Sequence, residues 1–397
     1  MAALAYLITG NDEVSGDAET AGPPADADDP DDASAPVDDR EAPSGPWTWE
    51  RIPPDADVFG VGREHPLTAI VAAGPGLVAV GHDSDRNAAV VWVSEDGWEW
   101  ERIEHDEDVF GGAGPQLMHD ATAGGPGVVA VGTDHGDAAV WISDDGREWE
   151  RIEHDEDVFG GEGRQDMHAV VEGGPGLVAV GRDRELGSAA VWVSEDDREW
   201  ERIEHDEEVF GGEGPQVMVD AAVTDQAVVA VGDDRGTDGD GAVWRSADGR
   251  DWERVQAPDV LGGHGAQFVT SVAAGGPGLV AVGHDFGVSA PAAWTSADGR
   301  TWERVVRDTS DVQGDPSGLM SAVTAVGPGL VTVGQDSGVA AAWFSDDAGR
   351  WQRIEHDEDV FGGDGEQRMT AVTSFREGLV AVGADDGVGQ AAVWHAK

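Results

Sequence analysis

SDDGREWERI, residues 143–152, is a phrase that returns along most of the chain. In it a serine, an aspartate two positions on, a glycine and a tryptophan lead into a short alternating segment. The other copies are SEDGWEWERI (94–103), SEDDREWERI (194–203), SADGRDWERV (246–255), SADGRTWERV (296–305), SDDAGRWQRI (345–354) and the partial copy SGPWTWERI (44–52). Self-similarity at a nearly constant spacing indicates a repeat architecture.

Each repeat unit of about fifty residues reads as four short strands. In the second unit a Pro-Gly pair after Gly125 suits a tight turn between the first two strands, because proline presets φ and glycine accepts positive φ. A long polar loop, residues 153–166, leads to the next unit. The four expected strands of this unit are residues 118–123, 127–132, 138–143 and 149–152.

The number of units follows from three residues that recur in every copy: a glycine that ends the second strand, and one tryptophan each in the third and fourth strands, seven of each. The chain enters the repeats on a fourth strand (47–52) and leaves them on a third (391–394). The sequence therefore predicts an all-β fold, a seven-bladed β-propeller with four antiparallel strands per blade, whose last blade is closed by the N-terminal strand. An open solenoid is the alternative.

The repeated phrase resembles the Asp-box, or BNR, repeat of sialidase-like propellers, S-x-D-x-G-x-x-W. Most copies here read S-x-D-G-x-x-W, one residue shorter, and residues 194–200 lack the glycine. The resemblance covers residues 47–397 and implies the propeller fold. It does not imply an activity, because such turns occur in hydrolases, receptors and assembly factors alike.

We expect the box residues to be structural. An aspartate can accept backbone N–H groups inside its own turn, and the serine assists. The tryptophan then covers the junction between turns. The residues assigned to this role are Ser94, Asp96, Trp100, Ser143, Asp145, Trp149, Ser246, Asp248, Trp252, Ser296, Asp298 and Trp302.

Function is sought where the blades differ, around the innermost strands. Cationic side chains stand out in so acidic a chain and can anchor an anionic ligand. The predicted ligand-binding residues are His119, Asp120, Arg164, His168, Arg182 and Asp220, with Arg184, His284 and Arg368 nearby. The alternative is that these polar side chains pair between neighbouring blades.

Other polar residues recur in most or all blades, which favours structural roles. A Gly-x-Asp series follows every second strand, and a glutamine precedes five first strands; we expect the aspartates to tie neighbouring loops together. The acidic EHDED loops (104–108, 153–157, 355–359) are either cation-binding or solvated, and they lack the ligand register of a calcium loop. No metal site and no cofactor are predicted, although a structural cation stays open.

The charge balance is extreme, with 24 basic and 80 acidic residues and a formal net charge of -56. Such a surface is typical of salt-adapted proteins and makes nucleic acid a poor partner. Residues 1–10 form an apolar stub that we interpret as a possible remnant of a membrane anchor or signal. Residues 11–46 read as an acidic disordered linker. Together they predict an extracytoplasmic domain, membrane-anchored or secreted.

These features favour a non-catalytic binding or scaffold propeller, monomeric, for a protein or polysaccharide partner at the cell surface. The alternative is a sialidase-like glycoside hydrolase without the usual tyrosine nucleophile, because the only tyrosine, Tyr6, lies outside the blades. The arginines outside the fourth strands show no asymmetric trio, and no catalytic residue is predicted. Trp98 is expected to be the one exposed aromatic residue.

Overall fold

A computed structural model describes residues 47–60, 67–74, 76–125, 127–236, 239–276, 278–306, 311–312, 318–387 and 389–397. The predicted apolar stub (1–10) and acidic linker (11–46) lie outside these residues. Residues from Ser44 to Lys397 belong to one compact unit. Within the described ranges, no helix has the length and apolar character needed to cross a bilayer.

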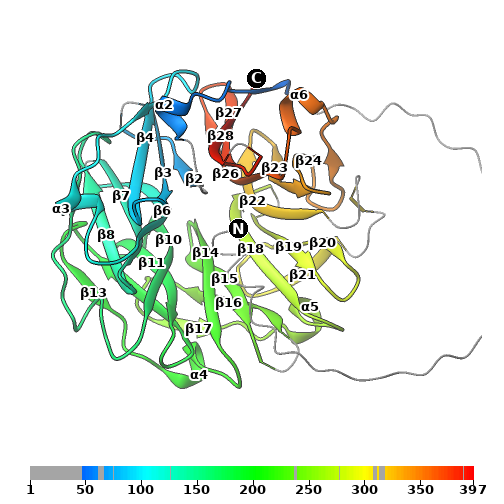
Figure 1. Cartoon of the computed structure of the whole chain (residues 1–397). Coiled ribbons are helices and arrows are strands. Elements are labelled where there is room, and N and C mark those ends of the chain that lie inside the picture. Colours follow the sequence, from blue (N-terminus) through cyan, green and yellow to red (C-terminus); the bar gives the residue numbers. More distant parts are fainter. Residues whose placement is uncertain are drawn as a thin grey trace, which may run out of the picture. The chain divides into compact units, whose positions relative to one another are not determined.

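The described strands form seven four-stranded antiparallel sheets arranged in a ring (Figure 1). This confirms the predicted seven-bladed β-propeller. Blades 1 to 3 consist of β2 (Leu67–Val71), β3 (Leu77–Asp83), β4 (Ala88–Ser94), β5 (Glu101–Arg102); β6 (Gln116–Gly124), β7 (Gly127–Asp134), β8 (Asp137–Ser143), β9 (Glu150–Arg151); and β10 (Gln165–Gly173), β11 (Gly176–Asp183), β12 (Ser188–Ser194), β13 (Trp200–Arg202).

Blades 4 to 6 repeat this order of strands. They consist of β14 (Gln216–Thr224), β15 (Ala227–Asp234), β16 (Asp240–Ser246), β17 (Trp252–Arg254); β18 (Gln267–Gly275), β19 (Gly278–Asp285), β20 (Ala290–Ser296), β21 (Trp302–Val306); and β22 (Leu319–Val326), β23 (Gly329–Asp336), β24 (Val339–Ser345), β25 (Gln352–Arg353).

Blade 7 is built from both ends of the chain, as predicted. The strands β26 (Gln367–Phe375), β27 (Gly378–Asp385) and β28 (Gln390–Ala396) are completed by β1 (Trp49–Arg51) in the order β1-β28-β27-β26. The Thr48 N–H donates to the Lys397 carbonyl at 2.9 Å, and the Lys397 N–H donates back at 3.1 Å. This shared sheet closes the ring without a capping element.

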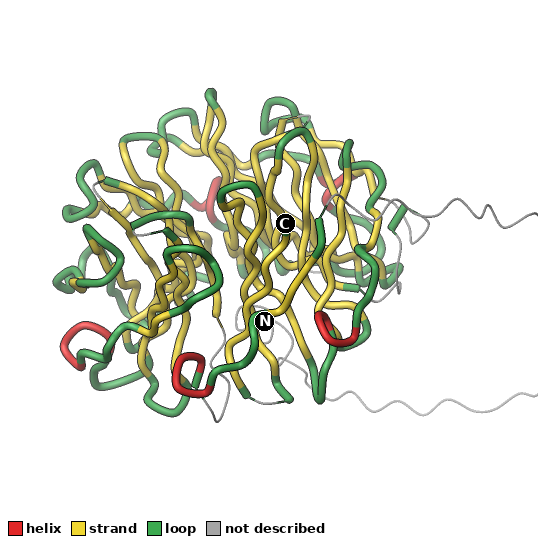
Figure 2. The backbone as a smooth tube through the Cα atoms, turned by 90° about the horizontal axis from the view of Figure 1, so that it is seen from above, coloured by secondary structure: helices red, strands yellow, loops and turns green. Residues whose placement is uncertain are grey.

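The apolar core lies between neighbouring blades. One typical cluster joins Val78 and Val80 of β3 to Met118, Ala130 and Trp141 of the next blade, all of them buried. Because the middle strands are covered on both faces, they read as nearly continuous apolar runs rather than as an alternation. In the side-on view of Figure 2, strands fill the middle of the molecule and loops gather towards its edges.

Every innermost strand contains a register shift opposite a glycine of the second strand. In blade 2 the shift skips His119, and a Cβ on the facing Gly132 would lie 1.9 Å from the Leu117 carbonyl oxygen. The recurring glycine therefore permits a β-bulge, which lengthens the innermost strand beyond its predicted bounds. Bulges re-aim side chains, and here they place His119 and His168.

The long loops between blades contain short helices, α2 (Ala56–Phe59), α3 (Glu107–Phe110), α4 (Glu207–Phe210), α5 (Pro258–Leu261) and α6 (Glu358–Phe361). In α3 the Asp106 carboxylate caps the helix by accepting the Asp108 N–H at 2.9 Å. The third-strand tryptophan Trp141 donates its indole N–H to the Val109 carbonyl at 2.8 Å. The EHDED phrases at 104–108 and 355–359 therefore cap short helices whose valine carbonyls accept the indole N–H groups of Trp141 and Trp394, whereas residues 156–159 form turns.

Turns between the third and fourth strands have the hydrogen bonds expected from the sequence. The Asp248 carboxylate accepts the N–H groups of Arg250 and Asp251 at 2.9 and 2.8 Å, and these backbone bonds lower its pKa. The Ser246 hydroxyl accepts the Gly249 N–H at 2.8 Å. The copy without glycine keeps the same backbone, with Asp197 at a φ of 69°.

The Gly-x-Asp series forms one ion pair in each blade. In blade 3 the Asp183 carboxylate accepts from the fourth-strand Arg202 at 2.6 Å and from the backbone N–H groups of Glu185 and Leu186. The structural role expected for this series is confirmed. The seven pairs are Arg51–Asp385, Arg102–Asp83, Arg151–Asp134, Arg202–Asp183, Arg254–Asp234, Arg304–Asp285 and Arg353–Asp336.

Candidate functional site

Two faces of the ring differ in their connections. The loops between second and third strands share one face with the loops that lead to the next blade, since the Gln116 N–H donates to the Asn87 carbonyl and the His135 N–H to the Pro115 carbonyl. We call this the loop face. The turns that join first to second and third to fourth strands lie on the other face, the turn face, where residues 73–74, 123–125 and 144–145 line a common pocket.

The blades differ most at the middle residue of the Gly-x-Asp series, close to the loop face. These residues follow the same glycine and precede the same ion-paired aspartate, yet they have no common chemistry. Around the ring they are His82, Thr133, Arg182, Asp233, His284, Gln335 and Ala384.

Two arginines of blade 3 converge on one carboxylate. The register of β10 and β11 sets Asp166 opposite Arg182, and Arg184 follows two residues on. The Nε atoms of both arginines lie 2.7 Å from the Asp166 Oδ2 atom. Burial alone would raise the pKa of Asp166, but the neighbouring His168 ring and the two guanidinium groups lower it below its usual range. The group is therefore a carboxylate that accepts two charge-assisted hydrogen bonds.

Two histidines lie beside this carboxylate. The rings of His119 and His168 meet edge to face with centroids 5.8 Å apart, and His168 Nε2 is 3.9 Å from Asp166 Oδ2. Both rings are partly exposed, but the surrounding protein disfavours their charged forms. Burial lowers the pKa of His119 to about 4 and that of His168 to about 3. At neutral pH both are neutral, so the arginines supply the positive charge that holds Asp166 ionised.

Blade 4 extends the cluster with a second aspartate–arginine pair. Asp233 is buried, and Arg235 Nη2 lies 3.7 Å from its Oδ2 atom. Neither carboxylate oxygen of Asp233 makes a hydrogen bond of normal geometry, and neither do Nε and Nη2 of Arg235. Burial raises the pKa of Asp233 to about 7, although Arg235, the Val269 N–H and Arg182 each lower it. Burial and the repulsion from Arg182 and Arg184 lower the pKa of Arg235.

Aromatic side chains continue the cluster into blade 5. The Arg235 guanidinium lies 6.0 Å from the Phe268 ring centroid, and Phe268 meets Phe286 edge to face at 5.1 Å. The His284 ring packs on Phe286 at 4.6 Å. Asp166, Arg182, Asp233, Arg235 and Phe268 thus follow one another across three blades. We call them, with Arg184 and Phe286, the blade 3–5 cluster.

Exposed apolar side chains flank this cluster. Among the described residues, three large hydrophobic side chains are exposed: Leu186 at 56%, Phe286 at 44% and Val288 at 54%. All three lie in loops between second and third strands, Leu186 in blade 3 and the other two in blade 5. They therefore stand on the loop face, on either side of the Arg235 loop.

Five of the six predicted ligand-binding residues separate into two groups. His119, His168 and Arg182 lie together around Asp166. Asp120 and Asp220 instead accept backbone N–H groups of the next blade, from Val170 at 2.9 Å and Val272 at 2.8 Å. Burial and the negative charge of Asp220 raise the pKa of Asp120 to about 7, and burial raises the pKa of Asp220 to about 6.

Arg164 is exposed, and its side chain packs over Gly136 of the neighbouring blade. Arg368 pairs with Asp386 at 2.7 Å in blade 7, away from the other arginines. The ligand role of all six predicted residues stays a prediction, while the alternative of pairing between blades describes Asp120, Asp220 and His168, whose Nδ1 lies 2.8 Å from the Met218 carbonyl oxygen of blade 4.

Two expectations about exposed or clustered side chains were wrong. Arginines outside the fourth strands do form an asymmetric trio, Arg182, Arg184 and Arg235, because the ring sets two successive loops side by side. Trp98 is only partly exposed: it stacks on His395 at 4.4 Å, and the Lys397 ammonium lies 4.1 Å from its ring centroid. Trp98 therefore packs the last turn of blade 1 against β28 and the residue that follows it.

Sequence reasoning missed Asp166, Asp233 and Arg235, and also the exposed Leu186, Phe286 and Val288. The variation at the middle position of the Gly-x-Asp series was a usable signal for Asp233. Predicting Asp166 would have required the register of β10 against β11. Predicting the exposed residues would have required knowing which loop positions point away from the core.

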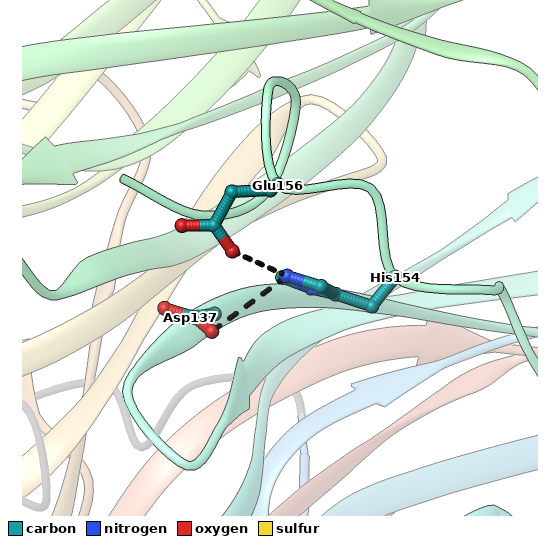
Figure 3. Close-up of side chains that lie close together, drawn as sticks. All are labelled: Asp137, His154 and Glu156. Carbon is teal, nitrogen blue, oxygen red and sulfur yellow. Dashed lines mark hydrogen bonds and ion pairs between the residues drawn. The ribbon is translucent and has the colours of Figure 1, made fainter. Parts of the chain in front are cut away.

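One further group could hold a metal ion. Within the described part of the chain, Asp137, His154 and Glu156 bring three ligand atoms within 4.8 Å of one another. They lie on the loop side of blade 2, where the carboxylates of Asp137 and Glu156 both face the His154 ring (Figure 3).

Comparison with known proteins adds no assignment. No protein-family model matches the chain, and no curated protein matches it either.

Proposed function

We propose that this chain is a non-catalytic binding propeller whose blade 3–5 cluster docks an acidic, partly apolar segment of a protein partner. The observation that carries the proposal is the coincidence of three arginines and the three exposed hydrophobic residues on one face of the ring, in a chain with a net charge of -56. Exposed apolar residues rimmed by charge are typical of protein interaction sites.

Charge supports the same assignment. A strongly anionic protein repels other acidic proteins, so association needs a local region of opposite sign. Arg182, Arg184 and Arg235 outnumber Asp166 and Asp233, and the raised pKa of Asp233 reduces the local negative charge further near neutral pH. The cluster therefore keeps a net positive charge towards an incoming carboxylate.

The setting we propose is the outer side of the membrane of a salt-adapted organism, with the propeller monomeric and held by its N-terminal segment. The acidic composition supports the salt adaptation, and the apolar stub before an acidic linker supports the tether. We further propose that the repeated turns are of the Asp-box type, on the strength of the Ser246–Gly249 and Asp248–Arg250 contacts.

A peptide selection tests the docking proposal. Random peptides displayed on phage are selected against the full chain in molar salt and then measured against variants. We expect selected peptides to combine Asp or Glu with aliphatic residues, and to lose binding to Arg235→Glu and to Phe286→Ser.

Arg300→Glu is the matched control, since this exposed arginine lies on the turn face and pairs with Glu253 at 2.7 Å. Peptides that bind all of these proteins equally would contradict the proposal. Binding of a carboxylated polysaccharide such as polygalacturonate, lost in the same variants and with no peptide selected, would assign the site to a polymer instead.

The arginine trio also favours a second candidate, a glycoside hydrolase that works with two carboxyl groups. Asp233 has a raised pKa and Asp166 a lowered one, and a pair of carboxyl groups with separated pKa values is what acid–base catalysis at a glycosidic bond requires. Turnover of fluorogenic sialosides or neutral glycosides that disappears in Asp233→Asn would support this candidate. No turnover across the panel leaves the binding proposal.

A further inference from the structure

Four of the loops between blades contain the same short-range pair, a histidine followed two residues later by a glutamate. In each pair the histidine Nε2 and a glutamate Oε2 lie 3.1 to 3.2 Å apart. Two donors at this distance are common on an acidic surface and do not make a metal site. The pairs are His105–Glu107, His154–Glu156, His205–Glu207 and His356–Glu358.

Among the described residues, only one of these pairs gains a third donor, from a different element. Asp137 begins β8, and its Oδ2 atom lies 3.9 Å from His154 Nε2 (Figure 3). The loop 153–161 has the same sequence as 104–112 and 355–363, so the difference comes from the strand beside it. At the position of Asp137, the other three blades have Ala88, Ser188 and Val339.

The spacing of these donors fits a small cation. A tetrahedral ion with bonds of about 2.0–2.1 Å has its ligand atoms roughly 3.4 Å apart. The two distances from His154 Nε2 are 3.2 Å to Glu156 and 3.9 Å to Asp137, close to either side of that value. Small side-chain rotations would equalise them.

The two carboxylates share one ion-pair partner. Among the described residues, His154 is the only ion-pair partner of Asp137 and of Glu156. Burial raises the pKa of Asp137, and the negative charges of Glu156 and Asp134 raise it further, against the effect of His154. A bound cation would relieve this repulsion.

We propose that Asp137, His154 and Glu156 bind a divalent cation of the Zn²⁺ class, with each residue supplying one ligand and water completing the coordination. An imidazole nitrogen with two carboxylate oxygens suits Zn²⁺, Co²⁺ or Mn²⁺ better than Ca²⁺ or Mg²⁺, which prefer oxygen ligands alone. The site is solvent-accessible, so the ion has an entry path. It would tie the loop 153–161 to blade 2.

Calorimetric titration of the full chain with Zn²⁺ in molar salt tests this proposal, with Co²⁺ as a spectroscopic probe. We expect one saturable site above the weak background of an acidic surface. The site should be lost in Asp137→Asn and in His154→Gln. Binding should weaken as the pH falls, because protons compete with the ion for its ligands.

Two variants serve as matched controls inside the same molecule. His205→Gln removes the histidine of a pair without a third donor and should leave the saturable site intact. Val339→Asp adds a carboxylate beside the His356–Glu358 pair in an otherwise identical loop, and should create a second site. The proposal would be overturned if the binding isotherms of Asp137→Asn and His154→Gln were the same as that of wild type. Because Val339 is half-buried, the Val339→Asp result counts only if the circular-dichroism spectrum shows that the variant is folded. The His154→Gln result tests the proposal independently of that variant.

Discussion

The turn face and the loop face use the same strands for different purposes. On the turn face, equivalent positions repeat one set of contacts: the Asp145 carboxylate accepts two backbone N–H groups at 2.8 Å, and Asp298 does the same at 2.8 and 2.7 Å. Close to the loop face, the middle residue of the Gly-x-Asp series changes from histidine to arginine to aspartate around the ring. Repetition in all blades indicates a structural role, whereas this position differs around the ring, and its residues in blades 3 to 5 belong to or adjoin the blade 3–5 cluster.

The Gly-x-Asp aspartates show that the loop face also has a repeated layer. Asp183 is buried and bonds to its own loop, while the adjacent Arg182 joins the blade 3–5 cluster. One residue separates a position that holds the blade together from one that varies. Substitutions at the repeated positions should therefore lower stability, whereas substitutions at the varying positions should alter binding.

The largest loss of stability is expected from the repeated layer. Asp183→Ala leaves the Arg202 guanidinium without its carboxylate and two loop N–H groups without an acceptor. Removing one partner of a buried pair costs roughly 3–5 kcal/mol, which a urea titration at fixed salt would measure. Glu101→Gln, which weakens an exposed pair with Arg147, should leave the midpoint unchanged. Equal effects of the two substitutions would contradict the structural role of the series.

Asp233→Asn tests the varying position through the pH dependence of the free energy of unfolding. A carboxyl group whose pKa rises from 3.8 unfolded to about 7 folded stabilises the fold below the lower value, and this stabilisation disappears as pH rises through 7. Asparagine stays neutral throughout. We therefore expect the variant to gain stability relative to wild type between pH 5.5 and 8, by roughly 2 kcal/mol. Thermal unfolding at the two pH values measures it, and a pH-independent difference would show that Asp233 does not titrate in this range.

A smaller gain is expected in the turn that lacks glycine. Asp197 has a φ of 69°, which glycine adopts without steric cost. Asp197→Gly should raise the free energy of unfolding by about 1 kcal/mol. The reciprocal change Gly146→Asp, at a φ of 77°, should lower it by a similar amount. Destabilisation by Asp197→Gly would mean that the aspartate makes a contact worth more than the strain.

The smallest effect on stability is expected at the exposed hydrophobic residues. Val288→Ser removes a side chain that stands largely in solvent, so it should change the free energy of unfolding by less than about 0.5 kcal/mol. Phe286→Ser also removes the ring contacts with Phe268 and His284 and should cost about 1 kcal/mol. The same substitutions should abolish binding of selected peptides. A large loss of stability would place these residues in the core and remove them from the proposed docking surface.

The ring itself could be predicted from the sequence because its causes are local and repeated. A glycine at each bulge and two tryptophans per unit recur seven times and the turn motif six times, and the phase of the two termini predicts the closure through β1 and β28. Most fourth strands are shorter than the four residues predicted, as β9 shows, while β21 is longer.

The site could be predicted only in part because it depends on contacts between blades. His119, His168 and Arg182 stood out as breaks in the repeat. Asp166 gives no such signal, because its partners Arg182 and Arg184 lie 16 and 18 residues away and meet it through strand register. Asp120 and Asp220 also break the repeat, but their carboxylates bond to the neighbouring blade.

Hydrogen exchange of the full chain, with and without a selected peptide in molar salt, tests the central claim most directly. If the blade 3–5 cluster is the docking surface, protection on binding will concentrate in the loops after β11, β15 and β19, with the turns after β8, β16 and β20 unchanged. Protection confined to those turns, or spread evenly over all seven blades, would contradict the account.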